Sequence, residues 1–186
     1  MIIPTTVEEL FELYERFGSK NYGEFVTQTE HALQCAALAQ RDGARRELII
    51  AALFHDVGHL AADVQDRVTF DLAKDDDGHE ALGARILSPI VGPTVAQPVA
   101  LHVVAKRWRC TRDPDYYDQL SPTSQTTLWA QGGLLNQDEC ERFETHPGFR
   151  EALWLRSWDE AGKQSDLDPG ELRDWEPLVN ELAAAR

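Results

Sequence analysis

The residues best suited to chemistry are a histidine and an aspartate that stand side by side, His55 and Asp56, at the end of an apolar segment. Three further histidines, His31, His79 and His102, lie about one helical hairpin apart from this pair and from one another. Imidazole and carboxylate ligands without a thiolate suit iron, manganese or zinc. A carboxylate also has two oxygens and can bridge two cations. The sequence therefore predicts a pair of metal ions held between helices.

A late carboxylate would complete such a site. Asp159 follows Leu155 and Trp158 on a segment whose apolar positions recur at helical spacing. With Asp56 and the four histidines it makes six candidate protein ligands, and the other coordination positions would be open to water, substrate or dioxygen. A lone buried histidine is more often a hydrogen-bonded core residue. Burying several imidazoles and a carboxylate without compensation would be costly, however, and a metal pair satisfies them together.

The apolar periodicity that must position these residues is helical nearly throughout. We expect helices over 7–17, 24–43 and 45–56, a loop over 61–77, helices that begin near residues 78, 93, 122, 137 and 149, and a last helix over 169–184. Residues 48–54 are apolar on nearly every face, which predicts a central, buried helix. Gly58 is expected to allow a tight turn after that helix. The sequence predicts one all-α domain over residues 1–186, a compact helical bundle with its core at about 20–170.

The composition of the chain limits the classes of molecule that it can bind. The net charge of −14 argues against binding to nucleic acid, whose phosphates would be repelled. No apolar run is long enough for a membrane span, and the chain begins without an export-type segment, so we expect a cytoplasmic protein with no membrane partner. The three cysteines are odd in number and lack a CxxC spacing, which predicts reduced thiols.

One basic cluster stands out from this acidic background. Lys106, Arg107 and Arg109 follow His102 within a few residues. Such a cluster is usually a solvated helix end. Its position beside a candidate metal ligand favours the alternative, contact with an anionic substrate.

Several longer stretches match a known pattern. They are Gly23-Glu24, Gln28, Glu30–Cys35, Ala51–His59, His102–Arg107, Leu120-Ser121, Ser124, Gln131–Gly133 and Arg156–Leu167. Over roughly residues 20–170 the chain resembles the HD-domain superfamily, which is named for its His-Asp pair. Within it the chain is most similar to the mixed-valent diiron oxygenases, in particular the phosphonate-cleaving dioxygenases. The His-Asp pair alone is weakly specific, because most HD proteins are phosphohydrolases, but the stretches after His102 and Arg156 are much more so.

The resemblance implies a reaction and a cofactor. An Fe(II)/Fe(III) pair would use O2 to split the carbon–phosphorus bond of a small organophosphonate. The implied substrate is a 1-hydroxyalkylphosphonate such as 1-hydroxy-2-aminoethylphosphonate or its N-trimethyl analogue, and the products are phosphate with glycine or glycine betaine. The implied metal ligands are His31, His55, Asp56, His79, His102 and Asp159, with Asp56 as the bridge.

The resemblance also implies substrate contacts. His59 would act beside the metals without ligating them, near the bound oxygen or substrate. Lys106 lies one turn after His102, and Arg156 one turn before Asp159, so both could reach a phosphonate. Of these, His59 and Lys106 are the candidate catalytic residues. Further candidate contacts are Gln28, Ser124, Thr127 and Lys163.

The resemblance also implies that a short region before His31 contacts the amino end of the substrate. In the family a tyrosine and a glutamate there close over the pocket. Glu24 matches, whereas Tyr22 lies one position out of register, with Asn21 in the expected place. A primary ammonium would favour hydrogen bonds from Glu24, and a trimethylammonium would favour an aromatic, anionic box. The sequence leaves these two substrates open.

Two other functions are consistent with an HD scaffold. A metal-dependent phosphohydrolase acting on a nucleotide or a phosphomonoester would use its metals to activate water. A non-enzymatic regulatory or binding module would bind a ligand and turn nothing over. The set of six candidate ligands argues against the second of these alternatives.

Overall fold

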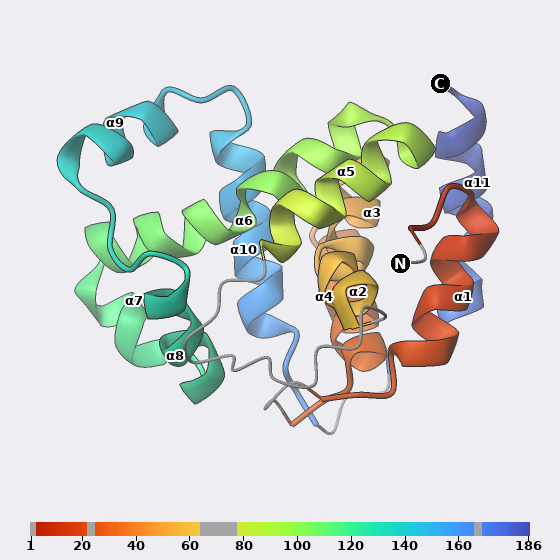
Figure 1. The fold of residues 1–186 in the computed structure, drawn as a ribbon, viewed down its shortest axis with the longest axis horizontal. Coiled ribbons are helices and arrows are strands. Elements are labelled where there is room, and N and C mark those ends of the chain that lie inside the picture. Colours follow the sequence, from red (N-terminus) through yellow and green to blue (C-terminus); the bar gives the residue numbers. More distant parts are fainter. Residues whose placement is uncertain (1–2, 22–24, 64–77, 166–168) are drawn as a thin grey trace.

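A computed structural model describes residues 3–21, 25–63, 78–165 and 169–186, and every regular element in these ranges is a helix (Figure 1). The elements are α1 (Val7–Phe17), α2 (Gln28–Arg41), α3 (Arg46–Phe54), α4 (Val57–Asp63), α5 (His79–Val91), α6 (Pro93–Arg112), α7 (Pro114–Gln119), α8 (Pro122–Ala130), α9 (Gln137–Glu144), α10 (Phe149–Ala161), the 3-10 helix η1 (Leu172–Trp175) and α11 (Glu176–Ala184). The all-α bundle predicted from the sequence is confirmed.

The core is built around α3, as its apolar sequence predicts. Its residues from Leu48 to Phe54 are all buried. The ring of Phe54 meets Phe11 and Tyr14 of α1 edge to face, with centroids 5.8 and 5.7 Å apart. Such aromatic contacts add to the free energy gained from apolar burial. The segment that ends in the His-Asp pair is therefore held firmly in the interior.

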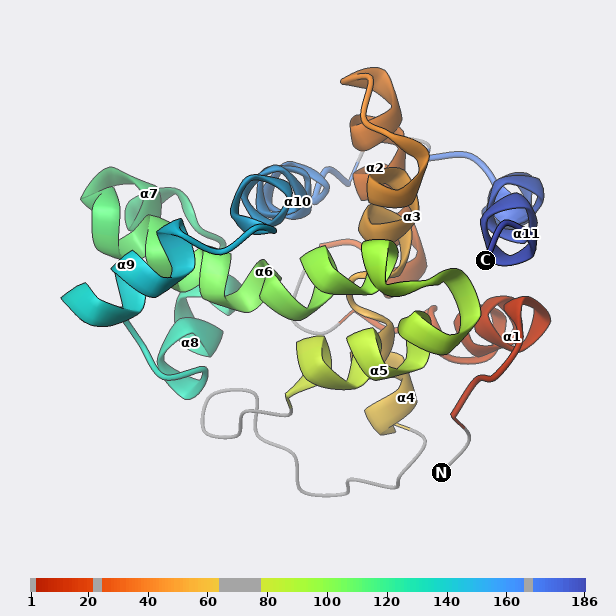
Figure 2. The same cartoon turned by 90° about the horizontal axis from the view of Figure 1, so that it is seen from above.

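The long helix α6 organises the rest of the molecule. Helices α7, α8 and α9 gather at one end of it, while α1 and α11 lie at the far side of α3 (Figures 1 and 2). Its partner α5 precedes it directly, and Gly92 between them has a φ of +97°, a backbone conformation that suits glycine. Helix α6 thus carries residues from the core to the cluster of small helices that includes α8.

Several helix boundaries differ from the sequence prediction for local reasons. Helix α2 begins at Gln28, not near residue 24, because Thr27 and Glu30 form a reciprocal capping box there. The expected loop over 61–77 is wrong for residues 61–63, which complete α4, and residues 64–77 lie outside the described part of the chain. The last segment starts as η1 and becomes α-helical only at Glu176. The short helix α7 was not expected.

The backbone turn after α3 occurs earlier than expected. His55 and Asp56 form it, and α4 starts at Val57, so Gly58 lies inside a helix. The structure gives another reason for glycine at position 58. A Cβ there would lie 2.0 Å from the backbone oxygen of His79. Gly58 therefore allows α4 to approach the start of α5, which brings His79 to the His-Asp pair.

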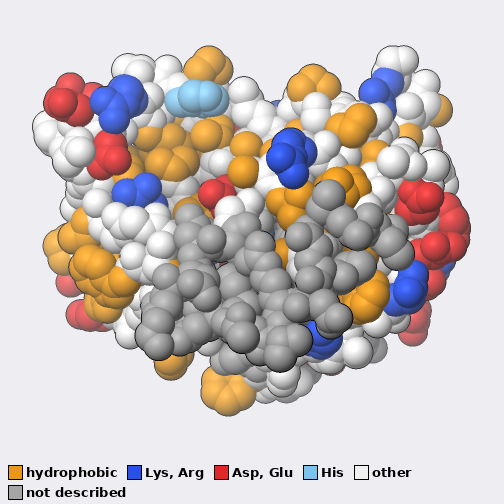
Figure 3. Space-filling view, viewed as in Figure 1, with side chains coloured by type: hydrophobic (Ala, Val, Ile, Leu, Met, Phe, Trp, Pro, Cys, Tyr) orange, Lys and Arg blue, Asp and Glu red, His pale blue; other side chains and the backbone are white. Residues whose placement is uncertain are grey.

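The surface reflects the acidic composition. In Figure 3 charged and hydrophobic side chains are intermixed, and acidic side chains gather at the end of this face where α1 lies. Cys35, Cys110 and Cys140 are buried, and none forms a disulfide. Among the described helices, none has the length and apolar character needed to cross a membrane.

Candidate metal centre

Four imidazoles from four different parts of the chain meet in the interior as two pairs. His31 lies in the first turn of α2 and His55 at the end of α3, and their Nε2 atoms are 3.2 Å apart. His79 begins α5 and His102 lies within α6, and their Nε2 atoms are 3.1 Å apart. All four side chains are buried. The sequence prediction that these histidines converge is thus met by the geometry.

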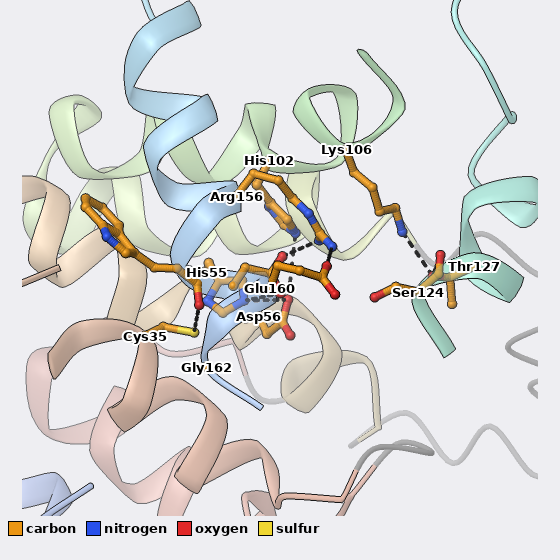
Figure 4. Close-up of polar contacts among 12 residues, drawn as sticks. Cys35, His55, Asp56, His102, Lys106, Ser124, Thr127, Arg156, Glu160 and Gly162 are labelled. Carbon is orange, nitrogen blue, oxygen red and sulfur yellow. Dashed lines mark hydrogen bonds and ion pairs between the residues drawn. The ribbon is translucent and has the colours of Figure 1, made fainter. Parts of the chain in front are cut away.

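Asp56 lies between the two pairs, and Figure 4 shows it beside His55. Its Oδ1 is 3.5 Å from Nε2 of His55 and 3.7 Å from Nε2 of both His79 and His102. Its Oδ2 is 3.8 Å from Nε2 of His31. One carboxylate therefore faces both imidazole pairs, and its two oxygens are placed to serve a cation at each pair.

Asp159 of α10 adds a carboxylate to the first pair. Its Oδ1 lies 3.4 Å from Nε2 of His31 and 3.8 Å from Nε2 of His55. Its Oδ2 accepts a hydrogen bond of 2.5 Å from Arg156. Because one oxygen is bound by the guanidinium, the other is directed at the imidazoles. Arg156 thus fixes the orientation of this carboxylate.

The proton positions on the imidazoles follow from their outer nitrogens. Nδ1 of His31 lies 2.7 Å from the carbonyl oxygen of Gly162, Nδ1 of His55 lies 2.9 Å from that of Ala52, and Nδ1 of His102 lies 2.7 Å from that of Val99. A carbonyl oxygen only accepts, so each Nδ1 carries the proton, and each ring in its neutral form directs its Nε2 lone pair inward.

The arrangement of these side chains decides whether the site fits a pair of metal ions. In neutral His31 and His55, two lone pairs face each other at 3.2 Å with no proton between them. Two carboxylates lie beside them in a buried site. Cations bound to these nitrogens and oxygens would turn that repulsion into attraction, and the donor set suits iron, manganese or zinc. The residues present therefore fit a metal pair.

The electrostatics of the site favour the ligand forms of most of these groups. Burial lowers the pKa of His55. Burial, with His79 and His55, lowers the pKa of His102 to about 3. Burial raises the pKa of Asp56, but His55, His59 and His79 outweigh it and hold that pKa well below its usual range. Neutral imidazole and ionised carboxylate are the forms that bind metals.

Next to the imidazoles is a cavity of about 80 Å³. Lys106 and Ser124 on its wall are buried, and Nζ of Lys106 donates to Oγ1 of Thr127 at 3.0 Å (Figure 4). Nζ of Lys163 donates to Oγ of Ser124 at 2.9 Å and lies 3.9 Å from Oδ1 of Asp159. Two ammonium groups and two hydroxyls thus surround a small space beside the candidate ligands, an arrangement suited to an anion.

The basic cluster predicted from the sequence divides in the structure. Only Lys106 lines the cavity. Arg107 donates to the carbonyl oxygens of Gly132 and Gly133 after α8, and Arg109 donates to the carbonyl oxygen of Leu153 and to Ser157. The two arginines therefore join helices. Neither arginine lines the cavity, in contrast to the expectation that the whole cluster meets an anionic substrate.

Arg156 lines the cavity but is largely engaged with the protein. Its Nε donates to the hydroxyl of Tyr116 at 2.8 Å, and its terminal nitrogens bind Asp159 and Glu160. Burial lowers the pKa of Arg156, but Asp159, Tyr116 and Glu160 outweigh it and raise that pKa. The contacts of Arg156 are thus mainly with a candidate metal ligand and its neighbours.

The remaining sequence candidates are placed as follows. His59 lines the cavity and stacks on His79, with ring centroids 3.8 Å apart and 17° between planes. Gln28 also lines the cavity, and its Oε1 is buried without a hydrogen-bond partner in the described part of the structure. Tyr22 and Glu24 lie outside the described residues.

Two polar residues of the cavity wall were missed. Thr123 and Gln131 lie on α8 or at its end, with Ser124 and Thr127 between them, and all four side chains line the cavity. The spacing of Ser124, Thr127 and Gln131 places them on one face of a helix, so the sequence could have indicated Gln131 as a neighbour of Ser124.

A comparison with protein families supports the class defined by this fold and site. The HD domain family matches residues 29–128 of the chain, a range that includes five of the six candidate ligands, all except Asp159.

Three relatives align over most of the chain. It is 43% identical over 173 residues to "Hydroxymethylphosphonate dioxygenase" of Gimesia maris, covering 93% of this chain and 86% of the relative. It is 34% identical over 178 residues to "[1-hydroxy-2-(trimethylamino)ethyl]phosphonate dioxygenase (glycine-betaine-forming)" of Leisingera caerulea, covering 95% and 89%. An uncharacterized protein of Acanthamoeba polyphaga mimivirus is 34% identical, with 84% and 72% covered.

The chain belongs to the HD-domain phosphonate dioxygenase family. It is therefore an enzyme of the oxygenase class, and the resemblance found in the sequence is confirmed.

Proposed function

We propose that this chain is a diiron oxygenase that uses O2 to cleave the carbon–phosphorus bond of a 1-hydroxyalkylphosphonate. The observation that carries the proposal is the position of Asp56 between two pairs of imidazoles, directly beside a cavity lined by Lys106 and Lys163. A candidate metal site and a candidate anion site here share one small cavity. This arrangement supports a reaction in which a phosphonate lies against two metals.

The roles of the residues follow from their positions. His31, His55 and Asp159 would hold one iron, His79 and His102 the other, and Asp56 would bridge them. A mixed-valent Fe(II)/Fe(III) pair would supply the redox chemistry with O2. The six side chains supply a fixed frame, because the backbone carbonyls of Gly162, Ala52 and Val99 orient three of the rings.

The substrate would be bound by the charged wall of the cavity. Lys106 and Lys163 would pair with the phosphonate, and the hydroxyls of Ser124 and Thr127, which already contact these ammonium groups, would complete its hydrogen bonds. Arg156 would act mainly by orienting Asp159. His59, on the same wall, is suited to hydrogen-bond the substrate and to move a proton at its hydroxyl.

The described cavity favours a small substrate. Imidazoles are the only aromatic rings that line it among the described residues, and its carboxylates, Asp56 and Asp159, already face the imidazoles or Arg156. No aromatic box for a trimethylammonium group is formed by this part of the chain. The 43% identity to a relative named hydroxymethylphosphonate dioxygenase supports hydroxymethylphosphonate as the first substrate, converted with O2 to formate and phosphate. Glu24 and Tyr22 would serve an amino substituent in 1-hydroxy-2-aminoethylphosphonate, and the N-trimethyl analogue would be the poorest of the three.

The experiment is an aerobic assay of the iron-loaded enzyme with each of these three phosphonates. We expect uptake of one O2 for each phosphate released, with formate, glycine or glycine betaine as the second product. We also expect two irons per chain and a mixed-valent electron spin resonance signal. Phosphate release under anaerobic conditions, or from a phosphomonoester, would contradict the proposal and favour the phosphohydrolase alternative.

The metal ligands are tested by substitution. His79→Ala or His102→Ala should remove one iron and abolish O2 uptake. His146→Ala is the matched control, because His146 lies between α9 and α10 and does not line the cavity. Two irons in the His79 and His102 variants would contradict the assignment of these residues.

A further inference from the structure

Glu80 follows His79 directly in the first turn of α5, and one of its oxygens is unusual. Oε2 of Glu80 is buried and has no hydrogen-bond partner in the described part of the structure. It lies 3.6 Å from Nδ1 of His79, on the side of the ring away from His102. A buried carboxylate oxygen without a donor costs free energy, so this oxygen requires a nearby N–H or O–H group.

Each of the other three imidazoles has a hydrogen-bond acceptor at its Nδ1. His31, His55 and His102 each have a backbone carbonyl oxygen at Nδ1. In His55 and His102 that carbonyl belongs to the residue three positions earlier, in the preceding turn of the same helix. His79 is the first residue of α5, and an acceptor near its Nδ1 is the carboxylate of Glu80. A carboxylate is the other acceptor commonly found behind a metal-bound histidine.

We propose that the carboxylate of Glu80 positions His79 for the second metal by accepting the proton on its Nδ1. The inference rests on the proposed function, because it assigns a role in holding one of the two irons. Ligation through Nε2 requires the proton of His79 to be on Nδ1, where it faces Oε2 of Glu80. The hydrogen bond to this carboxylate then fixes the plane of the ring and makes Nε2 a more basic, stronger metal ligand. Glu80 is thus a positioning residue, which acts through His79.

A purely structural role for Glu80 predicts a different result. An acidic residue in the first turn stabilises a helix through its dipole. If that were its whole role, Glu80→Gln would lower the melting temperature and leave both iron affinities unchanged. Glu151 offers a matched control, because it lies in the first turn of α10, which carries Asp159, and does not line the cavity. Glu151→Gln removes the same charge from a comparable place.

The test is an anaerobic titration of Fe(II) into the metal-free forms of the wild type, Glu80→Gln, Glu80→Asp and Glu151→Gln. We expect two irons in the wild type and in Glu151→Gln. In Glu80→Gln one of the two sites should bind iron about 10–100-fold more weakly, as is typical when the partner of a ligating histidine is removed. Glu80→Asp keeps the carboxylate and should recover part of that loss. The electron spin resonance signal of the mixed-valent pair should change in Glu80→Gln and stay as in the wild type in Glu151→Gln.

The outcomes separate this inference from the proposed function. Two irons in the wild type with unchanged affinities in Glu80→Gln would overturn the role of Glu80 and leave the diiron proposal intact. Fewer than two irons in the wild type would overturn both. Circular dichroism of each variant checks that the fold is retained, and Glu80→Asp keeps the test decisive if Glu80→Gln does not fold.

Discussion

At the scale of single residues, the chemistry of Lys106 depends strongly on its surroundings. It is 4% exposed, and its ammonium group donates to Thr127 on the cavity wall. Burial, assisted by the positive charge of Arg156, lowers the pKa of Lys106 to about 7. Burying this ammonium group is unfavourable, and an anion bound beside it would offset the cost.

The first prediction removes this charge. Lys106→Ala should retain two irons and raise the KM for the phosphonate about 10–100-fold, because a hydrogen bond to a charged group contributes about 1.5–3 kcal/mol. Steady-state O2 uptake and iron analysis measure the two effects separately. Arg85→Ala, which removes an exposed cation from α5, is the control. An unchanged KM in Lys106→Ala would exclude Lys106 from the phosphonate site.

The second prediction concerns pH. Lys106 is protonated below its pKa of about 7 and loses its charge as the pH rises through that value. The kcat/KM for the phosphonate should therefore fall on the alkaline side of about pH 7, since this ratio reports the free enzyme. Lys106→Arg keeps its charge at every accessible pH and should move or remove the decline. The titration of the substrate itself is common to both proteins, so identical profiles would refute the prediction.

At the scale of the elements, close backbone contacts set the distances between the helices that carry the site. Gly58 lets α4 touch the backbone of His79, and Gly162 lets the end of α10 approach α2, where a Cβ would lie 2.6 Å from Sγ of Cys35. The carbonyl oxygen of Gly162 then reaches His31. These two glycines bring the ligand-bearing segments together.

The third prediction follows from this contact. Gly58→Ala places a Cβ 2.0 Å from a backbone oxygen, so α4 and α5 must move apart and His79 with them. We expect a loss of stability of at least about 1–3 kcal/mol, the usual cost of overpacking, and weaker binding of one iron. Urea unfolding and iron titration are the measurements. Gly83→Ala is the matched control, since its Cβ first meets a methyl group of Val99 at 3.3 Å. Equal losses in both variants would contradict the argument.

Helix periodicity predicted most of these elements, and residue types predicted the candidate ligands. The buried helix before His55 and the helix starts at Pro93 and Pro122 are local features, and they are where the sequence indicates. The division of the basic cluster was not predictable, because the carbonyl acceptors of Arg107 come from Gly132 and Gly133, in a segment distant in sequence. The acceptor of His31, contributed by Gly162, likewise depends on tertiary packing.

At the scale of the whole molecule, the candidate centre joins segments that share little else. Its six side chains come from α2, from the turn that directly follows α3, and from α5, α6 and α10. Helix α6 continues from this centre to the cluster that contains α8, so the wall that would bind the phosphonate is fixed to the same frame as the metals (Figure 2). Any ligand bound at the centre therefore holds five parts of the bundle together.

The fourth prediction is that removing the metals will destabilise the whole fold. The imidazoles of His31 and His55 face each other closely, and Asp56 and Asp159 add negative charge to the same buried site. Without cations these groups are poorly compensated, whereas a metal that binds only the folded state adds stability in proportion to the logarithm of its concentration over its Kd. Chelation should therefore lower the melting temperature, and added Fe(II) should restore it in a concentration-dependent way. Asp56→Asn, which weakens the bridge, should show a smaller response to iron than the wild type. A melting temperature that is indifferent to chelation in a protein shown to contain two irons would mean that the helices hold this site in place unaided.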